Sequence, residues 1–139
     1  MNINFSFFII DDGELDRYVT QKFLERLDKN LIIKTFEDAE QALQLICENT
    51  ENDTSLPVVI LLDLQMPLMN GFKFVEEFEK LPLEVKKKYT IIVLTILSTA
   101  SNPTDIYRIL NYASVKSIVE KPLTKEKLFL LLNQAGAGI

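Results

Sequence analysis

The feature that most constrains the fold of this chain is an alternation of short apolar runs with amphipathic stretches of helical spacing. Two of the runs, Val58–Leu62 and Ile91–Leu94, are apolar almost without interruption. Such runs are typical of strands that are covered on both faces, as in a parallel sheet. The sequence predicts five buried strands: Asn4–Ile10, Leu31–Phe36, Val58–Leu62, Thr90–Thr95 and Lys116–Val119.

Five amphipathic segments lie between and after these strands, and their apolar residues recur at helical spacing. These residues are Leu15, Val19, Phe23, Leu24 and Leu27; Ala39, Ala42, Leu43, Ile46 and Cys47; Phe72, Phe74, Val75 and Phe78; Ile106, Ile109 and Leu110; and Leu128, Phe129, Leu131 and Leu132. Gly71 is expected to open the third helix, and segment 81–88 is expected to be a charged connector. Five strands alternating with five helices predict a doubly wound α/β fold, (βα)5, over residues 1–134, followed by a flexible tail at 135–139.

Composition removes several classes of function. The 139 residues amount to about one domain, and the net charge of −5 offers no basic stripe for nucleic acid. The chain holds no His, so Ser-His-Asp catalysis and His-containing zinc sites are excluded. The single cysteine, Cys47, forms no internal disulfide, which makes a reducing cytoplasm the simplest compartment. Asp11 and Asp12 interrupt the N-terminal apolar stretch, so neither a signal peptide nor a membrane span is expected.

Polar side chains stand where four of the predicted strands end. Asp11 and Asp12 follow the apolar run Phe7–Ile10, and Asp63 directly follows the apolar run Val58–Leu62. Thr95 is the last residue of the predicted fourth strand, and Lys121 follows the predicted fifth strand after one intervening residue. Because right-handed crossovers bring the carboxyl ends of parallel strands to one edge, we expect these side chains to be neighbours.

This group of residues suits phosphoryl transfer. Three carboxylates in one pocket repel one another unless a cation is present, and oxygen ligands without His or Cys favour Mg²⁺. Asp63 is the expected nucleophile, since carboxylates form aspartyl phosphates. Lys121 is expected to pair with the carboxylate at rest and with a phosphate oxygen later, while Thr95 donates to another phosphate oxygen.

Each of these residues alone has an ordinary explanation. Asp11 and Asp12 fit a solvated turn, Asp63 fits a helix N-cap, and Thr95 fits any strand. Lys121 alone fits a surface lysine. Convergence on one edge favours a site, because independent surface residues have no reason to gather there.

The same residues carry a resemblance to the receiver domains of bacterial two-component response regulators, along nearly the whole chain. Asp11-Asp12, the segment from Leu61 to Gly71, Thr95 and Lys121-Pro122 resemble the family's acidic pair, phosphoacceptor segment, switch hydroxyl and Lys-Pro pair. The resemblance implies a flavodoxin-like receiver fold and a cis Lys121-Pro122 bond. It also implies Mg²⁺ bound directly by Asp12 and Asp63, partly through water by Asp11, and by the backbone carbonyl of Gln65.

Partners follow from the same resemblance. A histidine kinase or phosphotransfer protein would supply phosphohistidine to Asp63, and the surface formed by residues 102–133 would signal to an output protein. We expect Leu15, Tyr18 and Val19, near the site, to form part of the kinase-docking face. Neither nucleic acid nor a membrane is expected as a partner. The chain is expected to catalyse its own phosphorylation and slow dephosphorylation, and no other reaction.

Some positions depart from the family pattern. Ile96 replaces a small residue after the switch hydroxyl, and Ile118 replaces the aromatic switch. Leu97 cannot hydrogen-bond an attacking water, and Gln65 also lies at a position that tunes dephosphorylation, so slow self-dephosphorylation is predicted. A degenerate receiver that binds proteins without phosphorylation is the alternative function.

Two other classes of protein fit less well. A phosphohydrolase with an aspartyl nucleophile often needs a second acid where Gln65 stands. An FMN carrier of the flavodoxin type needs a phosphate loop after the first strand, where Asp11-Asp12-Gly13-Glu14 would repel a phosphate.

Overall fold

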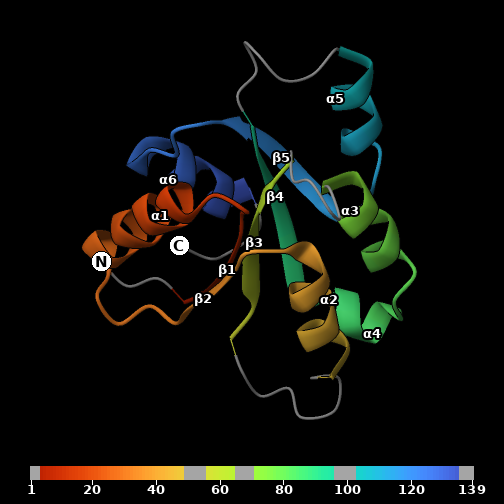
Figure 1. The fold of residues 1–139 in the computed structure, drawn as a ribbon, viewed down its shortest axis with the longest axis horizontal. Helices are drawn as coiled ribbons and strands as arrows, with labels where there is room; N and C mark the ends of the chain where they lie inside the picture. The colour runs from red at the N-terminus through yellow and green to blue at the C-terminus, as the bar shows by residue number, and fades with distance from the viewer. Residues whose placement is uncertain (1–3, 49–55, 65–70, 96–102, 135–139) are drawn as a thin grey trace.

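The structure is a computed structural model that describes residues 4–48, 56–64, 71–95 and 103–134. These residues form a parallel sheet between two layers of helices (Figure 1). The elements are β1 (Ser6–Ile10), α1 (Glu14–Leu27), β2 (Ile33–Phe36), α2 (Ala39–Glu48), β3 (Val58–Asp63), α3 (Gly71–Glu79), α4 (Leu83–Lys86), β4 (Tyr89–Thr95), α5 (Pro103–Leu110), β5 (Val115–Glu120) and α6 (Lys125–Gln134).

The five strands are all parallel and lie in the order β2-β1-β3-β4-β5. The predicted doubly wound α/β fold is therefore confirmed. The chain runs outward from β1 to β2, then crosses back to β3 on the other side of β1. The direction of winding thus reverses between β1 and β3, and open α/β sheets bind their ligands outside the carboxyl ends of the strands at such a point.

Each face of the sheet carries its own hydrophobic core. On one face, side chains of β1, β3 and β4 pack against Ala42 and Ile46 of α2, Phe74 and Phe78 of α3, and Ile109 of α5. On the other face, Leu24 of α1 and three leucines of α6 cover the sheet: Leu128, Leu131 and Leu132. Every residue of β1 and β3 is buried. Burial on both faces explains why Phe7–Ile10 in β1 and Val58–Leu62 in β3 are continuous apolar runs in the sequence.

The structure corrects several predictions. β2, expected to be buried, lies at the edge of the sheet and has no buried residue. Three residues of the predicted apolar helix stripes are exposed: Leu15, Val19 and Leu110. The connector expected at residues 81–88 contains the short helix α4, whose single turn is too brief to show helical periodicity. Cys47, expected to be packed, is exposed. The buried stripe of α2 runs through Ala39, Ala42 and Ile46, and Cys47 lies about 100° around the helix from Ile46.

The close approach of Gly71 to Leu64 fixes the start of α3 beside the end of β3. Gly71 donates its backbone N–H to the Leu64 carbonyl at 3.1 Å. A Cβ atom at residue 71 would lie 2.9 Å from Leu64 Cα, closer than side chains normally approach a backbone. Gly71 therefore opens the helix as predicted, and its lack of a side chain allows α3 to begin in direct contact with Leu64, the residue after Asp63.

No helix in the described part of the chain has the length and apolarity that crossing a membrane requires.

Candidate functional site

Four of the expected site residues stand at the carboxyl ends of four strands. Asp63 and Thr95 are the last residues of β3 and β4, while Asp11 and Lys121 follow β1 and β5 directly. The strand register brings them together, because Ile10 pairs with Leu62 and places Asp11 level with Asp63. At the other side, the Lys121 backbone N–H donates to the Thr95 carbonyl at 2.8 Å. The parallel ladder alone therefore assembles residues that are far apart in sequence.

Burial separates these side chains from ordinary surface residues. The buried polar or charged residues in the described ranges are Ser6, Asp11, Asp63 and Thr95. Three of the four belong to the predicted site. A carboxylate is costly to bury unless a cation or hydrogen-bond donors compensate for the lost water. Burial of Asp11 and Asp63 therefore indicates a compensated charge, and excludes the solvated-turn explanation for Asp11.

Asp11, Asp12 and Asp63 form a compact acidic cluster. Each offers a carboxylate oxygen, and the three oxygens lie within 4.8 Å of one another. Asp12 is exposed, so solvent reaches the cluster. Asp11 is fixed in place, since its Oδ1 accepts the Gly13 N–H at 2.9 Å and its carbonyl accepts from Arg17 at 2.8 Å. An oxygen-only set open to water fits Mg²⁺, which keeps several waters and uses few carboxylates.

The Lys121 ammonium compensates much of this negative charge. Its Nζ lies 3.1 Å from Asp11 Oδ2 and 3.5 Å from Asp63 Oδ1. Burial lowers the pKa of Lys121, but the carboxylates of Asp11 and Asp63 and the hydrogen bond to Asp11 outweigh that effect and hold the pKa above its ordinary value. The side chain is therefore a permanent cation at neutral pH.

Thr95 carries an unsatisfied hydroxyl. Its side chain is only 2% exposed, and among the residues that the structure describes its Oγ1 is the buried polar side-chain atom without a hydrogen-bond partner. Buried hydroxyls nearly always have partners, and exceptions call for an explanation. A hydroxyl at the end of β4, beside a strand that ends in Asp63, has the right placement to donate to a group attached to that aspartate.

Comparison with known proteins agrees with this geometry. The family described as the response regulator receiver domain matches residues 7–133. The chain belongs to the response regulator receiver family. Receiver domains are signalling modules of two-component systems, and they generally bind Mg²⁺ at an acidic pocket.

This receiver domain is similar to most of one relative and to a small part of another. It is 26% identical over 127 residues to Two-component response regulator 24 of Arabidopsis thaliana, covering 91% of this chain and 80% of that protein. It is also 26% identical to the peroxide stress-activated histidine kinase mak1 of Schizosaccharomyces pombe, covering 93% of this chain but 7% of the kinase. A crystal structure of a receiver protein from Dyadobacter fermentans has a TM-score of 0.79 and 27% identity, covering 94% and 96% of the two chains.

Three residues expected at the site of this receiver domain lie outside the described ranges: Gln65, Ile96 and Leu97. The Lys121-Pro122 bond is cis, as the resemblance implied. Ile118 is half-buried on β5 and packs against the core under α2, α3 and α5.

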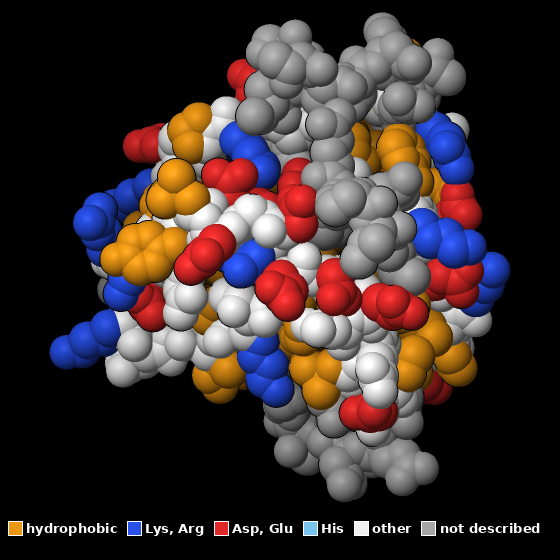
Figure 2. All heavy atoms as spheres, in the orientation of Figure 1, with side chains coloured by type: hydrophobic (Ala, Val, Ile, Leu, Met, Phe, Trp, Pro, Cys, Tyr) orange, Lys and Arg blue, Asp and Glu red, His pale blue; other side chains and the backbone are white. Residues whose placement is uncertain are grey.

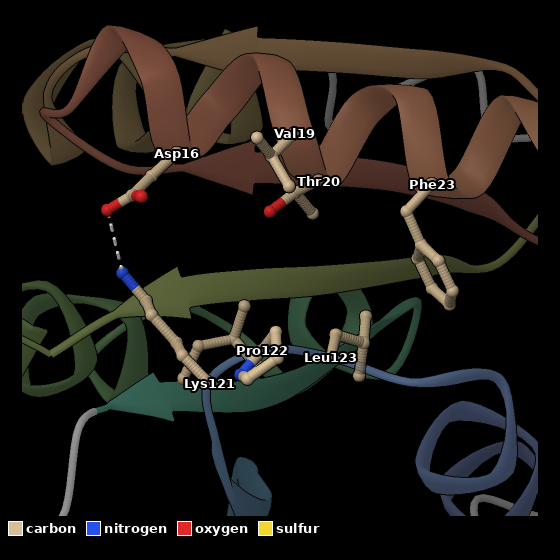
Figure 3. A pocket seen from close by; sticks show the side chains of 8 residues that line it. Asp16, Val19, Thr20, Phe23, Lys121, Pro122 and Leu123 are labelled. Carbon is tan, nitrogen blue, oxygen red and sulfur yellow. Dashed lines mark hydrogen bonds and ion pairs between the residues drawn. The ribbon is translucent and has the colours of Figure 1, made fainter.

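Sequence reasoning missed one residue at this receiver site. Asp16, in the first turn of α1, lies 3.4 Å from Lys121 Nζ. An acidic residue in a first helical turn has an ordinary explanation in the helix dipole, so the sequence alone gave no reason to single it out. Asp16 and Lys121 face each other at one end of a cavity of about 90 Å³ between α1 and the segment after β5 (Figure 3).

Proposed function

We propose that this receiver domain accepts a phosphoryl group on Asp63 from the phosphohistidine of a histidine kinase or phosphotransfer protein. The observation that supports this most is the gathering of three carboxylates, one ammonium and one unpartnered buried hydroxyl at a single edge of the sheet. A binding scaffold gains nothing from this arrangement, since the buried members Asp11, Asp63 and Thr95 each cost free energy to bury. Phosphoryl transfer needs all of them, because it depends on positioning and charge neutralisation.

In the proposed step, a carboxylate oxygen of Asp63 attacks the phosphorus atom in line with the leaving nitrogen. The new O–P bond forms as the P–N bond breaks. The departing nitrogen keeps the electron pair, and the donor ring leaves as neutral imidazole when its other nitrogen already carries a proton. Asp11, Asp12, Asp63 and the carbonyl of Gln65 would hold Mg²⁺, which supplies positive charge next to the transferred group. Because Asp12 is exposed, solvent and the phosphodonor would reach the acidic cluster from the side on which Asp12 lies.

Lys121 and Thr95 then stabilise the product. Lys121 lies 3.5 Å from Asp63 Oδ1 and can turn from the carboxylate to a phosphoryl oxygen with little movement. Thr95 would donate its hydroxyl to another phosphoryl oxygen and so gain the partner it lacks. Contacts present in only one state shift the conformational balance of the domain, and this is how such a site would signal.

An exposed apolar patch on α1 is the proposed docking surface for the phosphodonor. Leu15, Tyr18 and Val19 are 72%, 58% and 53% exposed. Figure 2 shows hydrophobic side chains over α1 at the left of the view, beside the charged groups. Exchange of Leu15 and Tyr18 for glutamate should slow transfer from a phosphodonor protein but leave phosphorylation by acetyl phosphate unchanged. Equal loss in both assays would contradict docking at this patch.

The surface of α5, β5 and α6, within residues 102–133, is proposed to bind the output partner. Tyr107 and Leu110 of α5 and Leu130 of α6 are large, exposed apolar residues on this surface. Tyr107 would serve as an anchor, since tyrosine is enriched among the residues that carry most of the affinity of an interface, and the two leucines would add apolar contact area.

Incubation with acetyl phosphate and Mg²⁺, followed by intact-mass spectrometry, tests the proposed function. We expect one phosphoryl group on the wild-type protein, none on Asp63→Asn, and none in EDTA. Circular dichroism of Asp63→Asn should match the wild type, which would separate loss of the acceptor from loss of the fold. A wild-type protein that takes up no phosphoryl group but binds partners would favour the phosphorylation-independent alternative.

A further inference from the structure

Lys121 is shared among three carboxylates that come from three different elements. Its Nζ lies 3.1 Å from Asp11, which follows β1, 3.5 Å from Asp63 of β3 and 3.4 Å from Asp16 of α1. The ammonium donates hydrogen bonds to Asp11 and Asp16 and forms an ion pair with Asp63. Asp11 and Asp63 belong to the acidic cluster, whereas Asp16 lies outside it.

Asp16 therefore competes with the site for the same cation. During phosphoryl transfer Lys121 must direct a donor toward the incoming group, and its bond to Asp16 opposes that change. A cavity lies beside the pair, and Val19 and Thr20 of α1 line it from one side and Leu123 from the other (Figure 3). Free space therefore adjoins the lysine side chain. Asp16 is 58% exposed, so its hold on Lys121 is weak enough to be broken in each reaction cycle.

We propose that Asp16 is a positioning residue that restrains Lys121 on the α1 side of the site and thereby slows phosphorylation of Asp63. This inference rests on the proposed phosphoacceptor function. It assigns to α1 a second role besides donor docking, because a partner that contacts α1 near Asp16 can weaken the restraint and release the lysine. The covalent step is unchanged, and only the availability of Lys121 differs.

The chain offers a matched control for this proposal. Glu14 lies in the same first turn of α1 and is exposed, and the structure records no ion pair between it and Lys121. Asp16→Asn and Glu14→Gln therefore remove the same charge from the same helical turn, but only the first frees Lys121. An exposed ion pair is worth up to about 1 kcal/mol, so Asp16→Asn should raise the phosphorylation rate at saturating donor about two- to fivefold.

The experiment measures phosphorylation by acetyl phosphate with Mg²⁺ over a range of donor concentrations. We expect Asp16→Asn to raise the saturating rate, Glu14→Gln to leave it unchanged and Asp16→Glu to restore the wild-type rate. In a Lys121→Met background, Asp16→Asn should have no effect, because the cation on which it acts is gone.

Several results would overturn the inference. The first is a phosphorylation rate of Asp16→Asn that is equal to or below that of the wild type. The second is a rise in the rate of Glu14→Gln as large as that of Asp16→Asn. The third is a rise caused by Asp16→Asn that persists in the Lys121→Met background. A merely structural role for Asp16 would lower the rate, so the sign of the change separates the two. A wild-type protein that accepts no phosphoryl group would refute the proposed function as well, whereas a normally phosphorylated wild type with an unchanged Asp16→Asn variant would refute the inference alone.

Discussion

Replacing Thr95 with valine should make the protein more stable and less able to bind a phosphoryl group. Thr95 is 2% exposed, and its Oγ1 has no hydrogen-bond partner. An unsatisfied buried polar group costs about 1 to 3 kcal/mol, and valine puts a methyl group in the same space. We therefore expect the free energy of unfolding to rise by about 1 to 2 kcal/mol. For a domain of this size, each kcal/mol raises Tm by about 3 °C.

Urea unfolding followed by circular dichroism measures the change in stability, and titration with beryllofluoride in Mg²⁺ measures phosphoryl-like binding. The loss of one hydrogen bond to a charged group should weaken that binding about tenfold. Thr90→Val is the matched control, because Thr90 lies on the same strand and is only half-buried. It should change neither property. A Thr95→Val protein less stable than the wild type would show that the hydroxyl is already satisfied, which would refute the reasoning.

Three further predictions concern packing, pH and metal. Gly71→Ala should lower the free energy of unfolding by about 1 to 3 kcal/mol, because the alanine Cβ would lie 2.9 Å from Leu64 Cα. Urea unfolding measures this change, and a variant as stable as the wild type would contradict it. Burial raises the pKa of Glu79, but the N–H of Ser114, 2.8 Å away, and Lys86 outweigh it and lower the pKa below 4.5. The stabilisation is thus present above pH 4.5 and lost as pH falls through the lower folded pKa. Glu79→Gln should accordingly cost about 1 kcal/mol at pH 7, and a cost that stays constant down to acid pH would contradict the linkage. Lys121→Met should lower stability in EDTA by about 2 to 3 kcal/mol, because it leaves buried carboxylates uncompensated, and Mg²⁺ should restore most of that loss in a thermal melt. A variant that gains no more from Mg²⁺ than the wild type would contradict this.

The fold could be predicted from the sequence because burial on both faces leaves an unmistakable pattern. The residues of β1 and β3 are all buried, and the polar residues among them, Ser6 and Asp63, stand only at a strand end. The helices were harder to describe in detail. Cys47 looked like part of the apolar stripe of α2, yet it lies one residue beyond Ile46 and so points away from the core. The apolar character of a residue does not by itself show whether it lies at the edge or at the centre of the apolar face of a helix.

The sequence predicts those site residues that stand at or directly after the ends of strands. Asp63 and Thr95 end strands, and Asp11 and Lys121 directly follow strands, so the parallel register brings all four together without further information. Asp16 does not end a strand. Its contact with Lys121 depends on how α1 lies against the segment after β5, which is a matter of tertiary packing that no local pattern in the sequence records.

The position of Lys121 links the proposed acceptance of a phosphoryl group to the completion of folding. Its ion pair with Asp11 joins residues that are 110 positions apart, and the strands that position the two lie on opposite sides of β3 and β4. Contacts of such long sequence separation form late, since the loop they close is large. A chain in which β5 has not yet joined the sheet has an acidic cluster without its cation. Under the proposed function, a chain in that state would lack the ammonium that stabilises the transferred group, so it would accept a phosphoryl group more slowly than the folded domain.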